Sequence, residues 1–434
     1  MATAVLGGCP DPGRDGTGTP GADPTPTPVP GGRVAFGVIG GPPSLDPYSP
    51  VATDLTRALV RPLLPSLFRF SPEGDAVADL AVDIAETRRR ATVTLVERQW
   101  STGRRITARD VVASAARARP PSGFAGLRAE ATGPFEIAFR PAGRKGVRDW
   151  AERLARSTYV LPRGRFRQGG PSSGPFELQR YVPGLKLVLA RSTTWEGTQA
   201  YLERVTVFFV ESLDIALELL DRGELAGAAL PMSVNLDERL DEMGLRHDET
   251  LGWESIRLEF NRDLITEDQV VAVAERVDRD TLEKGFVRDD GRITNTLNPA
   301  PCCRDGAYTH PAGRSGDAPD EVSLAAPAGD ELLILMQRAL QIQLGRDDID
   351  AELLVVPADR LYGRWRETSP AHAALLRVAG APGAVDPKTP WFAVPLVHIE
   401  TLVAWRDGEV FGLAVNPSLE GPLWNAESWF RNTG

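Results

Sequence analysis

The pattern closest to a catalytic motif lies at residues 170–174, where Gly-Pro-Ser-Ser-Gly fits G-x-S-x-G. In hydrolases with this pattern, a sharp turn between a strand and a helix exposes the serine hydroxyl for nucleophilic attack. Here the basic loop RGRFRQGG precedes Ser172, and the strand-like PFELQRY follows it. We therefore favour an ordinary loop, and a serine hydrolase using Ser172 remains the weaker alternative.

Histidine and cysteine spacing does not indicate a metal site. The four histidines are dispersed at His247, His310, His372 and His398. None of them belongs to an H-E-x-x-H or C-x-x-C pattern. Cys302 and Cys303 precede His310, but adjacent cysteines rarely supply two ligands to one tetrahedral ion. In an oxidising compartment they would form a vicinal disulfide or stay as two free thiols. We expect no metal, no cofactor and no enzymatic activity.

The remaining cysteine, Cys9, ends the sequence LGGC at residues 6–9, which resembles the lipobox of bacterial lipoproteins. In that motif the signal peptide is cleaved before the cysteine, and the thiol is acylated. Residues 10–32 are rich in Pro, Gly, Thr and Asp, a composition that favours extended chain over collapse. We expect residues 1–9 to be a signal remnant and residues 10–32 a disordered tether. The alternative is a disordered terminus with one stray cysteine.

Bulk composition limits the classes of partner. The chain has 434 residues, of which 42% are hydrophobic, and this is enough for two or three lobes with substantial cores. A net charge of −10 argues against a nucleic-acid partner, because phosphate binding needs clustered basic surface. The sequence contains no uninterrupted apolar run long enough to span a bilayer.

Hydrophobic periodicity predicts an α/β chain, because strand-like and helix-like segments alternate. The Gly-, Pro- and Asp-rich residues 285–328 are expected to form a long irregular insertion. The predicted strands are 33–40, 91–98, 204–210, 253–261, 351–357 and 392–400, with a hairpin at 175–191; the predicted helices are 106–119, 212–223, 266–279 and 330–345.

Several stretches, in order along residues 33–430, resemble the family 5 extracellular solute-binding proteins, which deliver peptides, nickel chelates and other solutes to ABC importers. The most specific is QWSTGRRITARDVVAS at 99–114, similar to a Trp-Ser-x-Gly turn followed by a Thr-Ala-x-Asp-Val helix. The others are PPSLDPY (42–48), LLPSLFRFSPEGDAVADLA (63–81), SSGPFELQRYVPGLKLVLARSTTW (172–195), LEFN (258–261) with VAVAERVDRDTL (271–282), and VPLVHIETLVAWRDGEVFGLAVNP (394–417).

The resemblance implies a two-lobed fold like that of type II periplasmic binding proteins. Lobe I would comprise residues 33–255 and the return segment 395–434, and a shortened lobe II would comprise residues 256–394. Two crossing strands, near 253–260 and 393–399, would form the hinge. The protein would be a monomeric, extracytoplasmic, lipid-anchored receptor that passes a small solute to ABC permease subunits.

In such proteins the ligand binds between the lobes, where closure excludes water. Aromatic rings with a few polar groups suit an amphipathic ligand. The alternative for any one of these residues is core packing, or for Asn261 the capping of a turn. The residues expected to line the cleft are Ser44, Tyr48, Pro231, Met232, Ser233, Trp253, Asn261, Trp391, His398 and Trp405.

The chain departs from the family pattern in two ways, and each suggests an alternative to the delivery of peptides to an importer. The peptide binders hold the ligand ammonium with an acid near the end of lobe II. The comparable residues 378–391 contain only Asp386, followed by Lys388, so free peptides are not the expected ligands. The short lobe II also suits a sensor or scaffold lipoprotein that has lost its importer.

Overall fold

The computed structural model describes residues 27–119, 122–231, 233, 235–286, 292–293, 318–328, 330–361, 369–379, 392–418 and 420–431. The predictions for Cys9, Met232, Trp391 and the Cys302–Cys303 pair, together with Asp386, lie outside these residues. Among the described helices, none has both the length and the hydropathy to cross a membrane.

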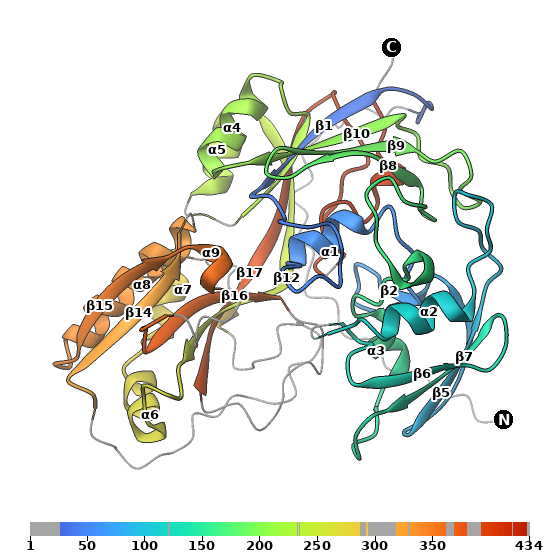
Figure 1. Ribbon diagram of the computed structural model, residues 1–434. Helices are drawn as coiled ribbons and strands as arrows, with labels where there is room; N and C mark the ends of the chain where they lie inside the picture. The colour runs from blue at the N-terminus through green and yellow to red at the C-terminus, as the bar shows by residue number, and fades with distance from the viewer. Residues whose placement is uncertain are drawn as a thin grey trace, which may run out of the picture.

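A mixed sheet of 11 strands runs through the molecule (Figure 1). Its order is β15-β14-β16-β12-β17-β11-β1-β10-β9-β8, with β13 paired to β17. The strands are β1 (Arg33–Ile39), β8 (Phe176–Val182), β9 (Lys186–Arg191), β10 (Arg204–Val210), β11 (Gly227–Leu230), β12 (Leu245–Phe260), β13 (Arg292–Ile293), β14 (Glu321–Pro327), β15 (Asp350–Val356), β16 (Ala373–Ala379) and β17 (Ala393–Arg406).

Two smaller sheets belong to the N-terminal half of the chain. A four-stranded antiparallel sheet has the order β4-β5-β7-β6, and β2 pairs with β3. The alternation in RATVTL of β5 buries Ala91, Val93 and Leu95 against the core. The strands are β2 (Phe68–Phe70), β3 (Ala76–Ala78), β4 (Ala81–Thr87), β5 (Arg90–Leu95), β6 (Leu127–Ala131) and β7 (Glu136–Pro141).

The helices are short except for α8, and most begin at a side-chain cap. The predicted capping box of α2 is present, with Asp110 accepting a hydrogen bond from the Thr107 backbone N–H (3.0 Å). The described helices are α1 (Asp54–Val60), α2 (Ala108–Ala115), α3 (Trp150–Ala155), η1 (Pro162–Gly164), α4 (Leu213–Asp221), α5 (Leu236–Glu242), α6 (Glu267–Glu275), α7 (Arg279–Phe286), α8 (Glu331–Gly345), α9 (Ala358–Leu361) and η3 (Ala426–Ser428).

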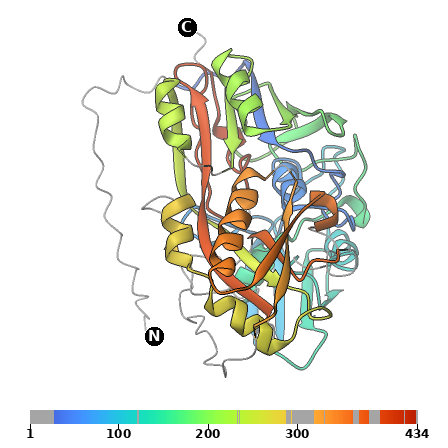
Figure 2. The same ribbon diagram turned by 90° about the vertical axis from the view of Figure 1, so that its left-hand side faces the viewer.

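Two large hydrophobic cores give the fold two lobes. The first core contains residues from β1 to β10 together with residues 403–429, and the second contains residues 256–397. The long strands β12 and β17 pass from one to the other, and Figure 2 shows β17 (red) continuing along the long axis of the molecule. The fold is therefore the expected two-lobed α/β fold, with lobes joined by crossing strands.

Most predicted elements are confirmed, and one prediction is wrong. Residues 285–328 are not irregular throughout, because residues 321–327 form β14, which is paired in parallel with β15 and β16. After Glu321 every residue of β14 is buried, since it lies inside the sheet. Such a strand lacks the polar alternation that marks a half-exposed strand, and its small residues resemble loop composition.

Candidate functional site

The pairing of β12 with β17 is interrupted where the two strands pass between the cores. Leu251 faces Glu400, and the next pair along the ladder is Glu254 with Ile399. Gly252 and Trp253 of β12 therefore have no partner residue on β17. A bulge of this kind disrupts the ladder hydrogen bonds and bends its strand. The same ladder has a second register shift between Ile256 and Arg257, so this part of the β12–β17 pairing is the candidate hinge between the lobes.

Charged side chains gather beside the bulge. Arg377 of β16 makes a two-point ion pair with Asp330, with nitrogen–oxygen distances of 2.5 and 3.0 Å, and lies 3.6 Å from Glu254. Partial burial raises the pKa of Glu254, Arg377 opposes that rise, and the charges of Asp54 and Asp330 add to it. Because Asp54 begins α1 in the first lobe, the electrostatics of the bulge couple groups from both lobes.

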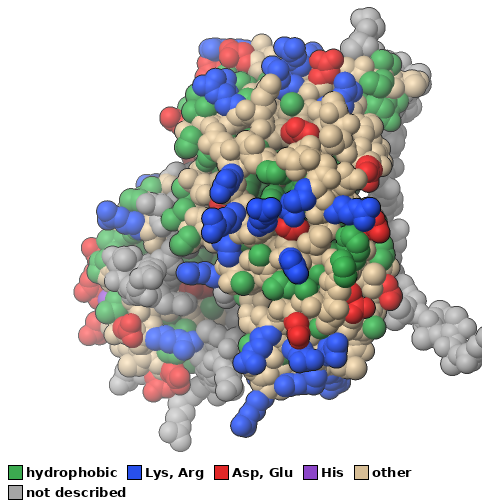
Figure 3. All heavy atoms as spheres, turned by 45° about the vertical axis from the view of Figure 1, so that its right-hand side comes forward, with side chains coloured by type: hydrophobic (Ala, Val, Ile, Leu, Met, Phe, Trp, Pro, Cys, Tyr) green, Lys and Arg blue, Asp and Glu red, His purple; other side chains and the backbone are tan. Residues whose placement is uncertain are grey.

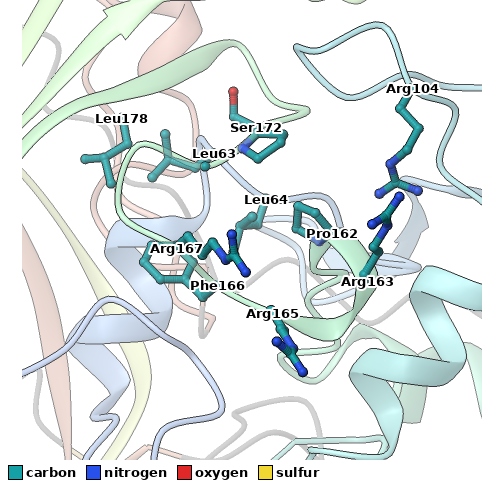
Figure 4. Close-up of a pocket in the computed structure, with 12 residues that line it drawn as sticks. Leu63, Leu64, Arg104, Pro162, Arg163, Arg165, Phe166, Arg167, Ser172 and Leu178 are labelled. Atoms are coloured by element: carbon teal, nitrogen blue, oxygen red, sulfur yellow. The ribbon is translucent and has the colours of Figure 1, made fainter.

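A basic pocket of about 500 Å³ lies in the first lobe, between η1 and the start of β8 (Figure 4). An adjoining hollow of about 430 Å³ shares the η1 segment with it and adds Asp46 and Arg117. Figure 4 shows the side chains of Arg104 and Arg163 converging on one side of the pocket. The lining residues are Leu63, Leu64, Arg104, Pro162, Arg163, Arg165, Phe166, Arg167, Gly170, Pro171, Ser172 and Leu178.

Ser172 lies at this pocket, but its surroundings are not those of a hydrolase nucleophile. The next regular element is the strand β8, which begins at Phe176, whereas the nucleophile turn requires a helix at this point. Its backbone is fixed by two hydrogen bonds with Ser101, at 2.8 and 3.2 Å. In the part of the chain that the structure describes, no group of His, Cys, Asp and Glu side chains is arranged to hold a metal ion.

Residues 75–311 match the sequence profile of the bacterial extracellular solute-binding proteins, family 5, in its middle region. The match covers more than half of the chain. The chain belongs to this family of extracellular solute-binding proteins. A search of curated proteins found no match.

Solved structures of similar fold have low sequence identity to this family 5 protein. The oligopeptide-binding protein AppA from Bacillus subtilis, in complex with a nonapeptide, has a TM-score of 0.76 and 16% identity over 94% of this chain and 100% of that one. AgaA from A. tumefaciens R10, in complex with agropinic acid, has a TM-score of 0.77 and 15% identity over 93% and 99% of the two chains. NikZ from Campylobacter jejuni, in complex with Ni(L-His), has a TM-score of 0.73 and 14% identity over 92% of this chain and 99% of that one.

The predicted residues of the first-strand loop are tied to the first lobe of this family 5 protein. The Tyr48 hydroxyl donates to the backbone carbonyl of Tyr159 (2.7 Å), and burial raises the pKa of Tyr48. The Ser44 hydroxyl oxygen accepts a hydrogen bond from the Asp46 N–H (3.1 Å). In this conformation both side chains order the loop, and ligand contact by them stays a prediction.

The other predicted residues fall into two groups. His398 pairs with Ser255 next to the bulge, and Trp253 lies within it, so the backbone brings these two positions together. Asn261 is buried, and its side chain accepts from the Asp263 N–H (3.2 Å), as the capping alternative predicts. Trp405, Pro231 and Ser233 lie apart from the bulge: Trp405 is packed against the first core beside Gly227, and Pro231 and Ser233 follow β11, half-buried.

Sequence reasoning did not identify the basic pocket. Arg163, Arg165 and Arg167 were visible as a basic loop preceding Ser172, but an isolated run of arginines is typical of solvated surface. Their regular spacing, i, i+2 and i+4, was the available signal. The residues that complete the pocket, such as Leu63 and Arg104, come from distant parts of the sequence and only the fold brings them there.

Proposed function

We propose that this protein is a lipid-anchored, extracytoplasmic receptor that encloses a small solute between its lobes and delivers it to an ABC importer. Membership of the solute-binding family supports the binding role. The observation that carries the mechanism is the ladder interruption between Leu251 and Glu254, where β12 and β17 pass between the lobes. Of these two strands, β17 contributes to both large cores, and β12 contributes to the second core and to the cluster around α4 and α5. Rotation at this bulge changes the distance between the lobes while each core stays intact.

The lobe limits form part of this proposal: lobe I at 33–255 and 395–434, and lobe II at 256–394. They are supported by the distribution of buried residues along the crossing strands. In β12, Ile256 belongs to the second core, and Leu245 packs against the helices α4 and α5 of the first lobe. In β17, Val397 belongs to the second core and Val403 to the first, so the change of core lies a few residues beyond the proposed limit at 394–395. Both proposed boundaries therefore fall inside the crossing strands.

The experiment first identifies the solute and then measures closure. Small molecules released from freshly purified protein are identified by mass spectrometry, and the candidate is returned to the stripped protein at saturation. Small-angle scattering should show a smaller radius of gyration, because a ligand shifts the open–closed equilibrium toward the form it prefers. A small molecule that does not bind serves as the control. An unchanged radius at saturation would contradict hinge closure.

Delivery is tested separately from closure. Genes for a permease and an ATPase are first sought beside this gene; their products are reconstituted in proteoliposomes, and ATP hydrolysis is measured with the loaded receptor. Stimulation by loaded but not by stripped protein is the expected result. Binding and closure without stimulation would favour the sensor or scaffold alternative.

A further inference from the structure

The basic pocket in the first lobe contains positive charge that the protein itself does not neutralise. Arg104 is paired with Asp110 through two contacts, at 2.9 and 3.0 Å. The guanidinium groups of Arg163, Arg165 and Arg167 have no hydrogen-bond or ion-pair partner among the residues that the structure describes. These three arginines are exposed to solvent and line one pocket, in a chain whose net charge is −10.

The acids nearest to the pocket are already engaged. Asp110 is held by Arg104 and by the backbone N–H of Arg163 (2.8 Å). Burial alone would raise the pKa of Asp110, but these hydrogen bonds lower it overall, so it stays ionised and paired. Asp46, in the adjoining hollow, forms an ion pair with Arg117 at 2.6 Å. Neither carboxylate is free to neutralise the three remaining arginines.

The backbone of η1 fixes the arginine segment in place. Arg163 has a φ of 52°, in the left-handed region that side-chain-bearing residues rarely adopt. Its N–H is bound to Asp110, and the carbonyl of Gly164 accepts from Arg117 (3.0 Å). A Cβ at position 164 would lie 2.6 Å from the Ala113 carbonyl oxygen, so glycine permits close packing of η1 on α2. A fixed backbone removes the cost of ordering the loop when an anion binds, and only the arginine side chains then lose rotamer freedom.

The rest of the pocket is apolar apart from one unpaired hydroxyl. Leu63, Leu64, Phe166 and Leu178 supply hydrocarbon surface. Ser172 is 4% exposed, and its hydroxyl oxygen has no hydrogen-bond partner. Buried hydroxyl groups in proteins are nearly always hydrogen-bonded, so this one is unusual, but its oxygen is closed to solvent and does not face the arginines (Figure 4). The pocket volume of about 500 Å³ lies in the range of small-molecule sites.

We propose that this pocket binds the acidic end of the solute, a small molecule with two or more anionic groups on a short apolar skeleton. The inference rests on the proposed receptor function and specifies its substrate class. Carboxylate and phosphate groups both match the planar donor fork of a guanidinium. Because every lining residue lies between positions 63 and 178, the first lobe can capture the anion before the second lobe closes.

The test uses the full chain and calorimetry with four probes at equal ionic strength. Propane-1,2,3-tricarboxylate and pyrophosphate distinguish carboxylate from phosphate recognition, and hexanoate and the triamide of the first probe are the mono-anionic and neutral controls. We expect saturable binding of at least one polyanion, weakened by added salt as ion pairing requires. Equal binding of hexanoate or the triamide, or no polyanion binding at millimolar concentration, would overturn the proposal.

The variants Arg165→Gln and Arg167→Gln should each weaken polyanion binding about tenfold, because each removes a charge-assisted hydrogen-bond donor. Arg128→Gln makes the same charge change at an exposed position of β6, outside the pocket, and should leave binding unchanged. An equal effect of Arg128→Gln would show long-range attraction only and would overturn the assigned site.

The two proposals fail in different ways. If the natural solute closes the lobes but binds equally well to the Arg165→Gln and Arg167→Gln variants, the receptor function stands and the anion site is wrong. If polyanions bind at these arginines but no solute changes the radius of gyration, the anion site stands and hinge closure is wrong.

Discussion

Asp79 is the carboxylate on which a buried cluster of arginines in the first lobe converges. Its side chain is 4% exposed, lies 2.7 Å from Arg98 and 3.8 Å from both Arg61 and Arg69, and accepts a hydrogen bond from the Ser66 N–H (2.9 Å). Burial alone would raise the pKa of Asp79, but the three arginines together lower it to about 2. The ionised form is therefore part of the folded state.

This depressed pKa predicts acid sensitivity. The unfolded value, 3.8, lies above the folded value of about 2, so the unfolded chain binds the proton more readily. The stabilisation is fully present above pH 4 and is lost as the pH falls through the folded pKa, by about 2 kcal/mol. Urea unfolding of wild type should show this loss, and Asp79→Asn should lack it. Asp83→Asn, at an exposed position of β4, is the control. If the stability of Asp79→Asn fell with pH as steeply as that of the wild type, the assignment of the acid sensitivity to Asp79 would be contradicted.

The arginine-rich loop at 163–167 forms part of the proposed anion site only because the fold places it beside the other pocket residues. Figure 3 brings the α2 side of the molecule forward and shows Lys and Arg side chains in a row across its middle. Most exposed arginines contribute little by themselves, because water screens them. Arg163, Arg165 and Arg167 are exposed as well, but they line one pocket together with an apolar wall.

The helix α8 is held to the sheet of the second lobe by one residue with two roles. Asp330 is its N-cap, accepting from the Leu333 N–H (3.2 Å), and also the partner of Arg377 on β16. Gln337, on the buried face of α8, donates to carbonyls of β14 and β15. These contacts fix α8 across the sheet, close to the bulge in β12.

Asp330→Ala should therefore reduce the stability of α8 by more than the loss of its N-cap alone would. Removing an N-cap costs about 1 kcal/mol, and leaving a largely buried Arg377 without its main partner adds about 1–3 kcal/mol. Hydrogen exchange of residues 331–345 should report the total as faster opening of α8. Asp149→Ala removes only a cap, that of α3, and is the matched control. Equal effects of the two substitutions would show that the Arg377 pair contributes nothing.

At the level of the whole molecule, β12 and β17 run from one lobe to the other, and residues 27–32 lead into β1 of the first lobe. Gly31 is already attached to the body, since its N–H donates to the Tyr201 carbonyl (2.7 Å). The proline-rich residues 10–32 would then separate the first lobe from an acylated Cys9. Under the proposed function, such a tether would keep the receptor near a membrane permease while leaving both lobes free to move.

We predict that Cys9 is acylated when the gene is expressed with its full upstream signal. Intact-mass measurement of the membrane fraction should show added acyl mass in wild type. Cys9→Ser should lack that mass, because serine has no thiol to accept the acyl group. Cys302→Ser is the control for nonspecific modification. An unmodified wild-type N-terminus in the membrane fraction would refute the lipobox interpretation.

The sequence by itself determined the family, the α/β class and most elements, because these depend on local information. Periodicity identified β10 and α8, and the WSTGRR turn with the Thr107 capping box identified α2. The same analysis of periodicity missed β14, since a fully buried strand lacks the alternation of polar and apolar residues that identifies a strand in the sequence.

Only the tertiary structure decided where the chemistry lies. The bulge at Leu251–Glu254 follows from the register of β12 against β17, whose sequences are separated by more than a hundred residues. The basic pocket requires the segments at 63–64, 104, 162–172 and 178 to meet. Whether an arginine is paired or free depends on which acids the fold brings within a few ångströms, and residue order does not encode those distances directly.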